Sequence, residues 1–119
     1  MVFKEMVIQS PRYGRMPKLE FQGAWLEAIS FVPGTLVCAS YQDACLTLSA
    51  NHGRATPNTV RMICVKSKQV RGRPRTLLTL DGFLLKRYGF HVGDRVVLQL
   101  SPNMIQITRV SHFTTVEVS

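Results

Sequence analysis

Long apolar runs are absent from this sequence. No stretch approaches the roughly 18 consecutive apolar residues of a membrane-spanning helix, and the opening MVFKEMVIQS lacks the apolar segment of a signal peptide. The composition, 45% hydrophobic and 18% charged, is that of a folded globular protein rather than a disordered one. We therefore expect a cytoplasmic protein, free or associated with the nucleoid, with no membrane partner.

Cysteine is scarce, and its spacing excludes the common metal motifs. Cys38, Cys45 and Cys64 are an odd number, lie among apolar residues and form no CxxC or Cys/His pattern. We interpret them as small buried apolar side chains and expect no disulfide and no zinc. The seven acidic residues are scattered and offer no carboxylate cluster for magnesium. The sequence therefore predicts no metal and no cofactor.

Histidine is equally sparse. His52, His91 and His112 are the only three, and none lies within a recognisable catalytic motif. A metal-independent ribonuclease needs a base and an acid close together, near a cation that stabilises the charged transition state. We assign no catalytic residue from the sequence, and cleavage of RNA remains an alternative to simple binding.

The acidic residues are too few to balance the basic ones. Fifteen Lys and Arg against seven Asp and Glu leave a net charge of +8, with a pI near 10.0. Charges balance over residues 1–50, so the excess lies in residues 51–119. A stretch without any acid carries seven cations: Arg54, Arg61, Lys66, Lys68, Arg71, Arg73 and Arg75. Such a concentrated positive field favours the phosphate backbone of a nucleic acid.

An internal repeat organises the chain. Between residues 19–37 and 78–96, positions 59 residues apart are identical at six places: Leu19/Leu78, Gly23/Gly82, Leu26/Leu85, Phe31/Phe90, Gly34/Gly93 and Val37/Val96. A chain of 119 residues buries one modest core but not two, so the copies must share it. We predict a first unit over residues 1–50, a linker over 51–60, a second unit over 61–110 and a tail over 111–119.

Each copy predicts the same order of elements. An alternating strand (residues 18–22 or 77–80) leads through a glycine into a short helix (24–29 or 82–88), with Asp81 as the N-cap of the second. Ser30 and Gly89 end the helices, and Phe-x-x-Gly forms an apolar anchor and a turn. A hairpin follows, pairing residues 35–41 with 45–49 or 95–100 with 104–110, with turns at 42–43 and 102–103. Upstream strands are predicted at 3–8 and 62–66, each followed by a Gly-Arg loop, at 12–15 and 71–75.

The first copy resembles the SymE toxin family. The run RYGRMPKLEFQGAWLEAISFVPGTLV carries an Arg-rich loop, a Pro-x-Leu strand, Gly-x-Trp-Leu and Phe-x-x-Gly in the order of that family. The second copy has Leu84 in place of Trp25, and its Gly-Asp turn is similar to the wider SpoVT-AbrB, or MazE-like, superfamily. The resemblance implies a mostly β swapped-hairpin barrel with two short helices. Here one chain would supply both units as a pseudo-dimer, and assembly into a homo-oligomer is a further alternative.

The resemblance also implies which residues bind nucleic acid. In AbrB-like proteins basic residues on the loops and strands before each unit contact the phosphates. The positions that match are Arg12, Arg15, Arg71, Arg73 and Arg75, with Lys18, Lys66 and Lys68 flanking them, and Tyr13 is a candidate to stack on a base. Arginine suits this role because its planar fork binds phosphate with two hydrogen bonds, whereas Trp25, Phe31, Leu85 and Phe90 are expected in the core.

Two outcomes follow for binding. We expect DNA, in preference to RNA, as the partner, and six phosphate contacts predict a slope of log affinity against log salt of about −5. The charge asymmetry predicts that Arg71 and Arg73 contribute more than Arg12 and Arg15. The alternatives are an endoribonuclease toxin that cleaves RNA, or an AbrB-like regulator or antitoxin; no protein antidote is indicated by the residues.

Overall fold

The computed structural model describes residues 2–8, 16–42, 44–50, 60–80 and 82–110. Within these ranges the chain is mostly β, with two short helices, as predicted. The elements in chain order are β1 (Val2–Val7), β2 (Glu20–Gln22), α1 (Ala24–Ala28), β3 (Leu36–Gln42), β4 (Cys45–Ser49), β5 (Arg61–Cys64), β6 (Lys66–Val70), β7 (Arg73–Thr79), α2 (Gly82–Arg87), β8 (Arg95–Ser101) and β9 (Met104–Val110).

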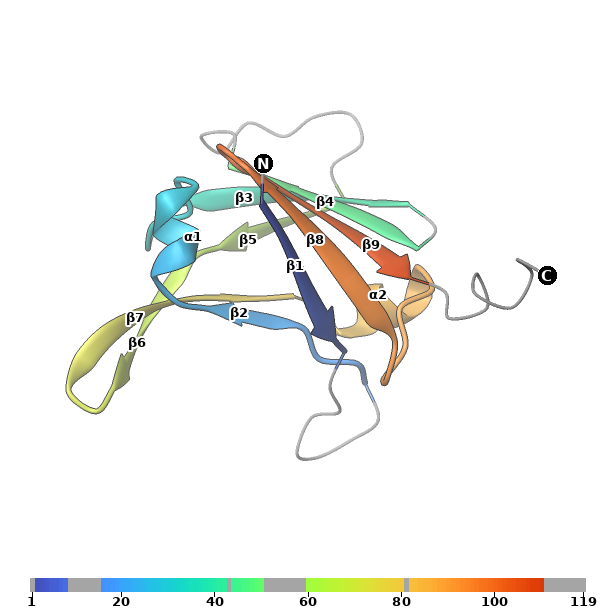
Figure 1. Ribbon diagram of the computed structural model, residues 1–119, viewed down its shortest axis with the longest axis horizontal. Coiled ribbons are helices and arrows are strands. Elements are labelled where there is room, and N and C mark those ends of the chain that lie inside the picture. The colour runs from blue at the N-terminus through green and yellow to red at the C-terminus, as the bar shows by residue number, and fades with distance from the viewer. Residues whose placement is uncertain (1, 9–15, 43, 51–59, 81, 111–119) are drawn as a thin grey trace.

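The strands form two antiparallel sheets. The larger has the order β1-β8-β9-β4-β3-β5, and the smaller has the order β2-β7-β6 (Figure 1). The predicted closed barrel is wrong for the described residues. The smaller sheet bonds only within itself and the outer strands β1 and β5 do not pair with each other, so the edges stay open.

One apolar core joins the sheets and helices. Phe21 and Leu78 of the smaller sheet, Leu26 of α1, Leu85 of α2 and the alternate residues of the larger sheet belong to a single buried cluster. The alternation follows the two-residue period of a strand, with every second residue of β8 buried. The two sheets therefore pack around one hydrophobic core, which is what a chain of 119 residues is expected to bury.

The predicted helix ends are confirmed. Both helices end within one residue of the predicted bounds, and Ser30 and Gly89 follow them with φ of 75° and 92°. The Phe31 amide donates to the Leu26 carbonyl at 2.9 Å, and the Phe90 amide to the Leu85 carbonyl at 2.8 Å. This is the left-handed C-terminal motif in which the chain reverses and an apolar residue closes over the last turn. The Phe-x-x-Gly anchors are therefore fully buried.

Ser30 is the weaker of the two helix ends. A left-handed conformation costs a residue with a Cβ roughly 1–2 kcal/mol, whereas glycine adopts it freely but loses more entropy on folding. We expect Ser30→Gly to raise the free energy of unfolding by about 0.5–1 kcal/mol. Urea denaturation measures it, with Gly89→Ser as the matched control, which should lower stability. A Ser30→Gly variant less stable than wild type would show that the Ser30 side chain supplies a compensating contact.

Two central strand pairs join positions 59 residues apart. Glu20 of β2 pairs with Thr79 of β7, and Thr47 of β4 pairs with Gln106 of β9. The outer strands also make matching contacts: the Gly34 amide donates to Val65 O and the Gly93 amide to Ile8 O, both at 2.8 Å. The two halves of the described fold therefore make similar backbone contacts at these places.

Predicted turns and cores differ from the structure in three places. The first hairpin closes between Gln42 and Cys45, one residue later than predicted, while Pro102-Asn103 is confirmed. Cys38 is buried as predicted, whereas Cys45 is only half-buried and Cys64 is exposed because it lies on the edge strand β5. Trp25 is only half-buried, unlike Phe31, Leu85 and Phe90, and packs edge-on against Phe21.

Some predictions lie outside the described residues. These are the Asp81 cap, the first Gly-Arg loop, the linker residues 51–59 and the tail 111–119. In the part of the chain that is described, no helix is long and apolar enough to span a bilayer.

Candidate nucleic-acid interface

Strands β6 and β7 form a hairpin whose tip is Arg71-Gly72. Val70 pairs with Arg73, so the turn has two residues, with φ of 52° and 78°. Two successive positive φ values match the twist of a tight hairpin. The prediction of a loop over residues 71–75 is therefore wrong. Pro74 is tolerated in β7 because β2 pairs only with residues 77–79, leaving that side of the strand free at Pro74.

The register places four cations on one face of this hairpin. Lys68 lies opposite Arg75, Lys66 opposite Leu77 and Val70 opposite Arg73. Residues directly opposite each other share a face, and alternate residues of a strand do too. We call Lys66, Lys68, Arg73 and Arg75 the basic face.

The basic face points away from the core. Thr76 and Leu78, on the other side of β7, are buried, and Phe21 beside them belongs to the core cluster. All four cations are exposed, as is Arg71 at the tip of the hairpin. Figure 1 shows the β6–β7 hairpin projecting beyond the rest of the molecule. Among the described residues none of these five cations lies within ion-pair distance of a carboxylate. Like charges directly opposite repel, so an anion bound across Lys68 and Arg75 would relieve an unfavourable contact.

The other predicted binding residues divide into two groups. Lys18 lies beside β2, with its Nζ 3.9 Å from Glu20 Oε2, and is therefore partly neutralised. The Glu20 carboxylate also accepts hydrogen bonds from Gln22 Nε2 at 2.7 Å and Thr79 Oγ1 at 3.3 Å. Arg12, Tyr13 and Arg15 lie outside the described residues.

A hollow of about 460 Å³ lies between the hairpin and the start of α1. Its walls include Arg71, Arg73 and Arg75 from the hairpin and Glu27 from α1. The Gly23 amide donates to the Thr76 carbonyl at 3.1 Å, which ties the beginning of α1 to β7. The three arginines offer an anion several N–H donors along the hairpin wall, whereas the Glu27 carboxylate makes the α1 side less favourable for a phosphate.

A second polar cluster, which the sequence did not reveal, lies at the Phe90–Asp94 turn. The His91 amide donates to Asp94 Oδ2 at 2.8 Å, and His91 Nδ1 lies 3.6 Å from the same oxygen. Arg109 Nη1 is 4.0 Å from Asp94 Oδ2 and donates to the Gly89 carbonyl at 2.8 Å. We call His91, Asp94 and Arg109 the His91 cluster. The His-x-x-Asp spacing was a local signal for it, but the approach of Arg109 from β9 was not readable from the sequence.

The described residues hold no candidate metal centre. No group of three or more His, Cys, Asp or Glu within the described ranges could hold an ion. His52 and His112 lie outside those ranges.

The chain is similar in sequence to curated SymE proteins of enteric bacteria. It is 34% identical over 68 residues to "Endoribonuclease SymE" of Escherichia coli (strain ATCC 8739) and to "Toxic protein SymE" of Escherichia coli (strain K12), matches covering 50% of this chain and 60% of each relative. It is 33% identical over 58 residues to "Endoribonuclease SymE" of Shigella flexneri serotype 5b, covering 45% and 51%.

These similarities are partial. The chain spans between about half and 60% of the length of the curated relatives it matches. No protein-family model matches the chain, and no solved structure matches it either. The curated relatives are thus toxic and RNA-cleaving by name, and this chain is similar to them over about half of its own length.

Proposed function

We propose that this chain acts on RNA as a SymE-type toxin of a toxin–antitoxin system, binding single-stranded RNA through the basic face and cleaving it. The observation that carries the binding step is the set of exposed cations on β6 and β7, which lack acidic partners among the described residues. The names of the relatives favour RNA over the DNA expected from the sequence.

The spacing of the cations suits an extended phosphate backbone. Residues on one face of a strand repeat every two positions, about 7 Å, which resembles the spacing of successive phosphates in an extended strand. Arg73 and Arg75 each offer a planar fork for two hydrogen bonds to phosphate, while Lys66 and Lys68 add point charges. None of these contacts reads a base, so this face supplies affinity and not sequence preference. Arg12, Tyr13, Arg15 and Lys18 complete the proposed interface.

The proposal includes an architecture in which two AbrB-like units, residues 1–50 and 61–110, exchange strands as a pseudo-dimer. It is supported by strand pairing: β1 of the first unit pairs with β8 of the second, and β5 of the second pairs with β3 of the first. The central pairs Glu20/Thr79 and Thr47/Gln106 join positions related by the repeat. The units differ in charge, so the second carries most of the proposed binding surface.

The test is an affinity series with labelled single-stranded RNA, single-stranded DNA of the same sequence and duplex DNA of equal length. Five phosphate contacts predict a slope of log affinity against log salt of about −3.5 for single strands. We expect RNA to bind most tightly, and fluorescence anisotropy at salt concentrations between about 50 and 200 mM measures both quantities. Tighter binding to duplex DNA, or affinity independent of salt, would refute the proposal.

A further inference from the structure

An accessible imidazole, a carboxylate and a guanidinium meet at the turn before β8. His91 has 59% of its side chain exposed, Asp94 27% and Arg109 35%. One ring nitrogen, Nδ1, faces the Asp94 carboxylate at 3.6 Å, and no described residue is hydrogen-bonded to the other, Nε2. A carboxylate on one nitrogen of a histidine orients the ring and leaves the other nitrogen to exchange a proton with a ligand.

The turn itself does not require these residues. The Asp94 amide donates to the His91 carbonyl at 3.0 Å, and the matching turn 59 residues earlier has the same bond from Thr35 to Val32, also at 3.0 Å. There the counterparts of His91 and Asp94 are Val32 and Thr35, and the position matching Arg109 is Ala50. The same backbone forms with and without the polar set, so stability of the turn does not account for it.

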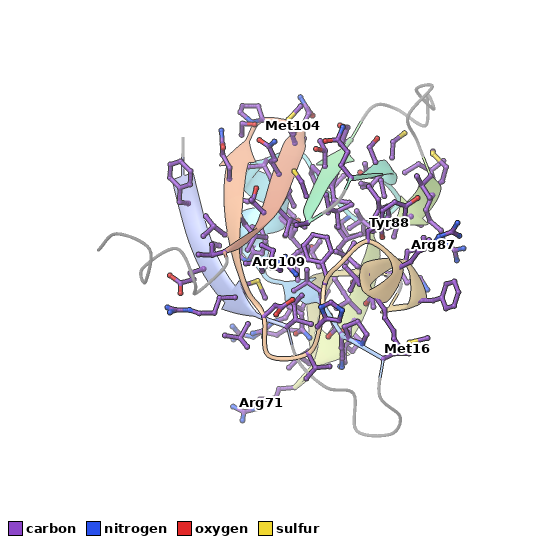
Figure 2. All side chains as sticks on the ribbon, turned by 90° about the vertical axis from the view of Figure 1, so that its right-hand side faces the viewer. Met16, Arg71, Arg87, Tyr88, Met104 and Arg109 are labelled. Carbon is purple, nitrogen blue, oxygen red and sulfur yellow. The ribbon has the colours of Figure 1, made fainter. Side chains whose placement is uncertain are left out.

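Further cations lie at the same end of the molecule. Lys86 and Arg87 occupy the last turn of α2, and both are exposed. Figure 2 shows this end face-on, with Arg109 near its centre and Arg87 toward one side. Arg95, next to Asp94, forms an ion pair with Glu5. An RNA strand that passes His91 therefore has the exposed cations Lys86 and Arg87 at the same end of the fold to contact its neighbouring phosphates.

We propose that the His91 cluster is the centre at which RNA is cleaved, an inference that rests on the proposed function. His91 Nε2 removes the proton of a ribose 2′-hydroxyl, and the 2′-oxygen forms a bond to the adjacent phosphorus. The bond from phosphorus to the 5′-oxygen of the next nucleotide breaks, and that oxygen takes a proton from water. The products are a 2′,3′-cyclic phosphate and a 5′-hydroxyl. The imidazolium then returns its proton to solvent.

The other two members have supporting roles in this step. Asp94 places a carboxylate oxygen 3.6 Å from Nδ1 and stabilises the imidazolium that forms, so it is a positioning residue. Arg109 has five N–H donors, of which the Gly89 carbonyl uses one, and its charge stabilises the phosphorane. General base catalysis of this kind contributes roughly 10²- to 10⁴-fold to a rate.

The experiment follows cleavage of end-labelled single-stranded RNA by the full chain and its variants. His91→Ala and His91→Gln should slow cleavage by about 100-fold or more, while affinity for RNA stays within about twofold. Val32→Ala, at the matching turn, is the control and should cleave as wild type does. Added imidazole should restore part of the activity of His91→Ala, which a merely structural loss would not allow. Asp94→Asn should slow cleavage while RNA binding is retained. An RNA with a 2′-deoxyribose at the cleavage site should not be cleaved there, because it lacks the attacking hydroxyl.

The outcomes separate this inference from the proposed function. A His91→Gln variant that cuts RNA as fast as wild type would overturn the inference while leaving the proposed function in place. Wild-type protein that binds RNA without cutting it would overturn both the inference and the cleavage step of the proposed function. Wild-type protein that fails to bind RNA would overturn the proposed function itself. Cyclic phosphate ends on the fragments, together with rescue by imidazole, would support the His91 mechanism directly.

Discussion

Arg73→Ala/Arg75→Ala should weaken binding to single-stranded RNA by on the order of 100-fold at about 0.1 M salt, since each hydrogen-bonded charge pair contributes roughly 1.5–3 kcal/mol. Both side chains belong to the basic face, and neither has an acidic partner among the described residues. Removal of two phosphate contacts should also reduce the salt slope by about 1.4. Anisotropy across a salt series measures the two effects together.

The hairpin supplies its own matched control. Ser67 and Gln69 alternate with Lys66 and Lys68 along β6 and so lie on the opposite face of the same strand. Ser67→Ala/Gln69→Ala should leave RNA affinity within about twofold of wild type. Equal losses in the two double variants would indicate damage to the hairpin rather than loss of phosphate contacts. Arg12→Ala/Arg15→Ala should cost less than Arg71→Ala/Arg73→Ala, as the uneven charge predicts.

Gly82→Ala should destabilise the fold by about 1–3 kcal/mol, because overpacking of a tight contact has costs of that size. A Cβ at position 82 would lie 2.6 Å from the Pro17 carbonyl oxygen and 3.2 Å from Met16 Cβ. Alanine is the better helix former by up to about 1 kcal/mol, which offsets part of the loss. The contact joins the start of α2 to the chain just before β2, so segments far apart in the sequence meet there.

Urea denaturation measures the effect of Gly82→Ala. Lys86→Ala on the exposed side of the same helix is the control, and it should change stability by less than about 0.5 kcal/mol. A Gly82→Ala variant as stable as wild type would mean that the segment before β2 moves away from α2 without loss of packing.

Local patterns with a single physical meaning were predictable from the sequence. The buried anchors Phe31 and Phe90, the left-handed Gly89 and the Pro102-Asn103 turn follow from apolar spacing and turn chemistry. The turn glycines Gly34 and Gly93 have similar φ values of 92° and 90°, whereas Gly23 precedes α1 with φ of 126° and Gly82 is the first residue of α2. Cys38 was predicted correctly as a core residue, whereas Cys64 was not, since burial on an edge strand depends on neighbours that the sequence does not show.

Features that depend on distant partners were not predictable. Gly72 and Pro74 indicated a loop, yet they fit a hairpin because β7 has a free side at Pro74. The alignment of Lys68 opposite Arg75 depends on the register of that hairpin, so the basic face emerged only from the fold. The sequence alone gives His91 the character of an ordinary turn residue. Only the fold brings Arg109, near the end of β9, to within 4.0 Å of Asp94 and so completes the cluster.

The most direct test of RNA action is to incubate the purified protein with labelled single-stranded RNA and duplex DNA, and to resolve each mixture on native and denaturing gels. We predict a salt-sensitive shift of RNA on the native gel and shortened RNA on the denaturing gel, with DNA left intact. Intact RNA, combined with a stronger shift of duplex DNA, would contradict this account and identify a DNA-binding protein instead.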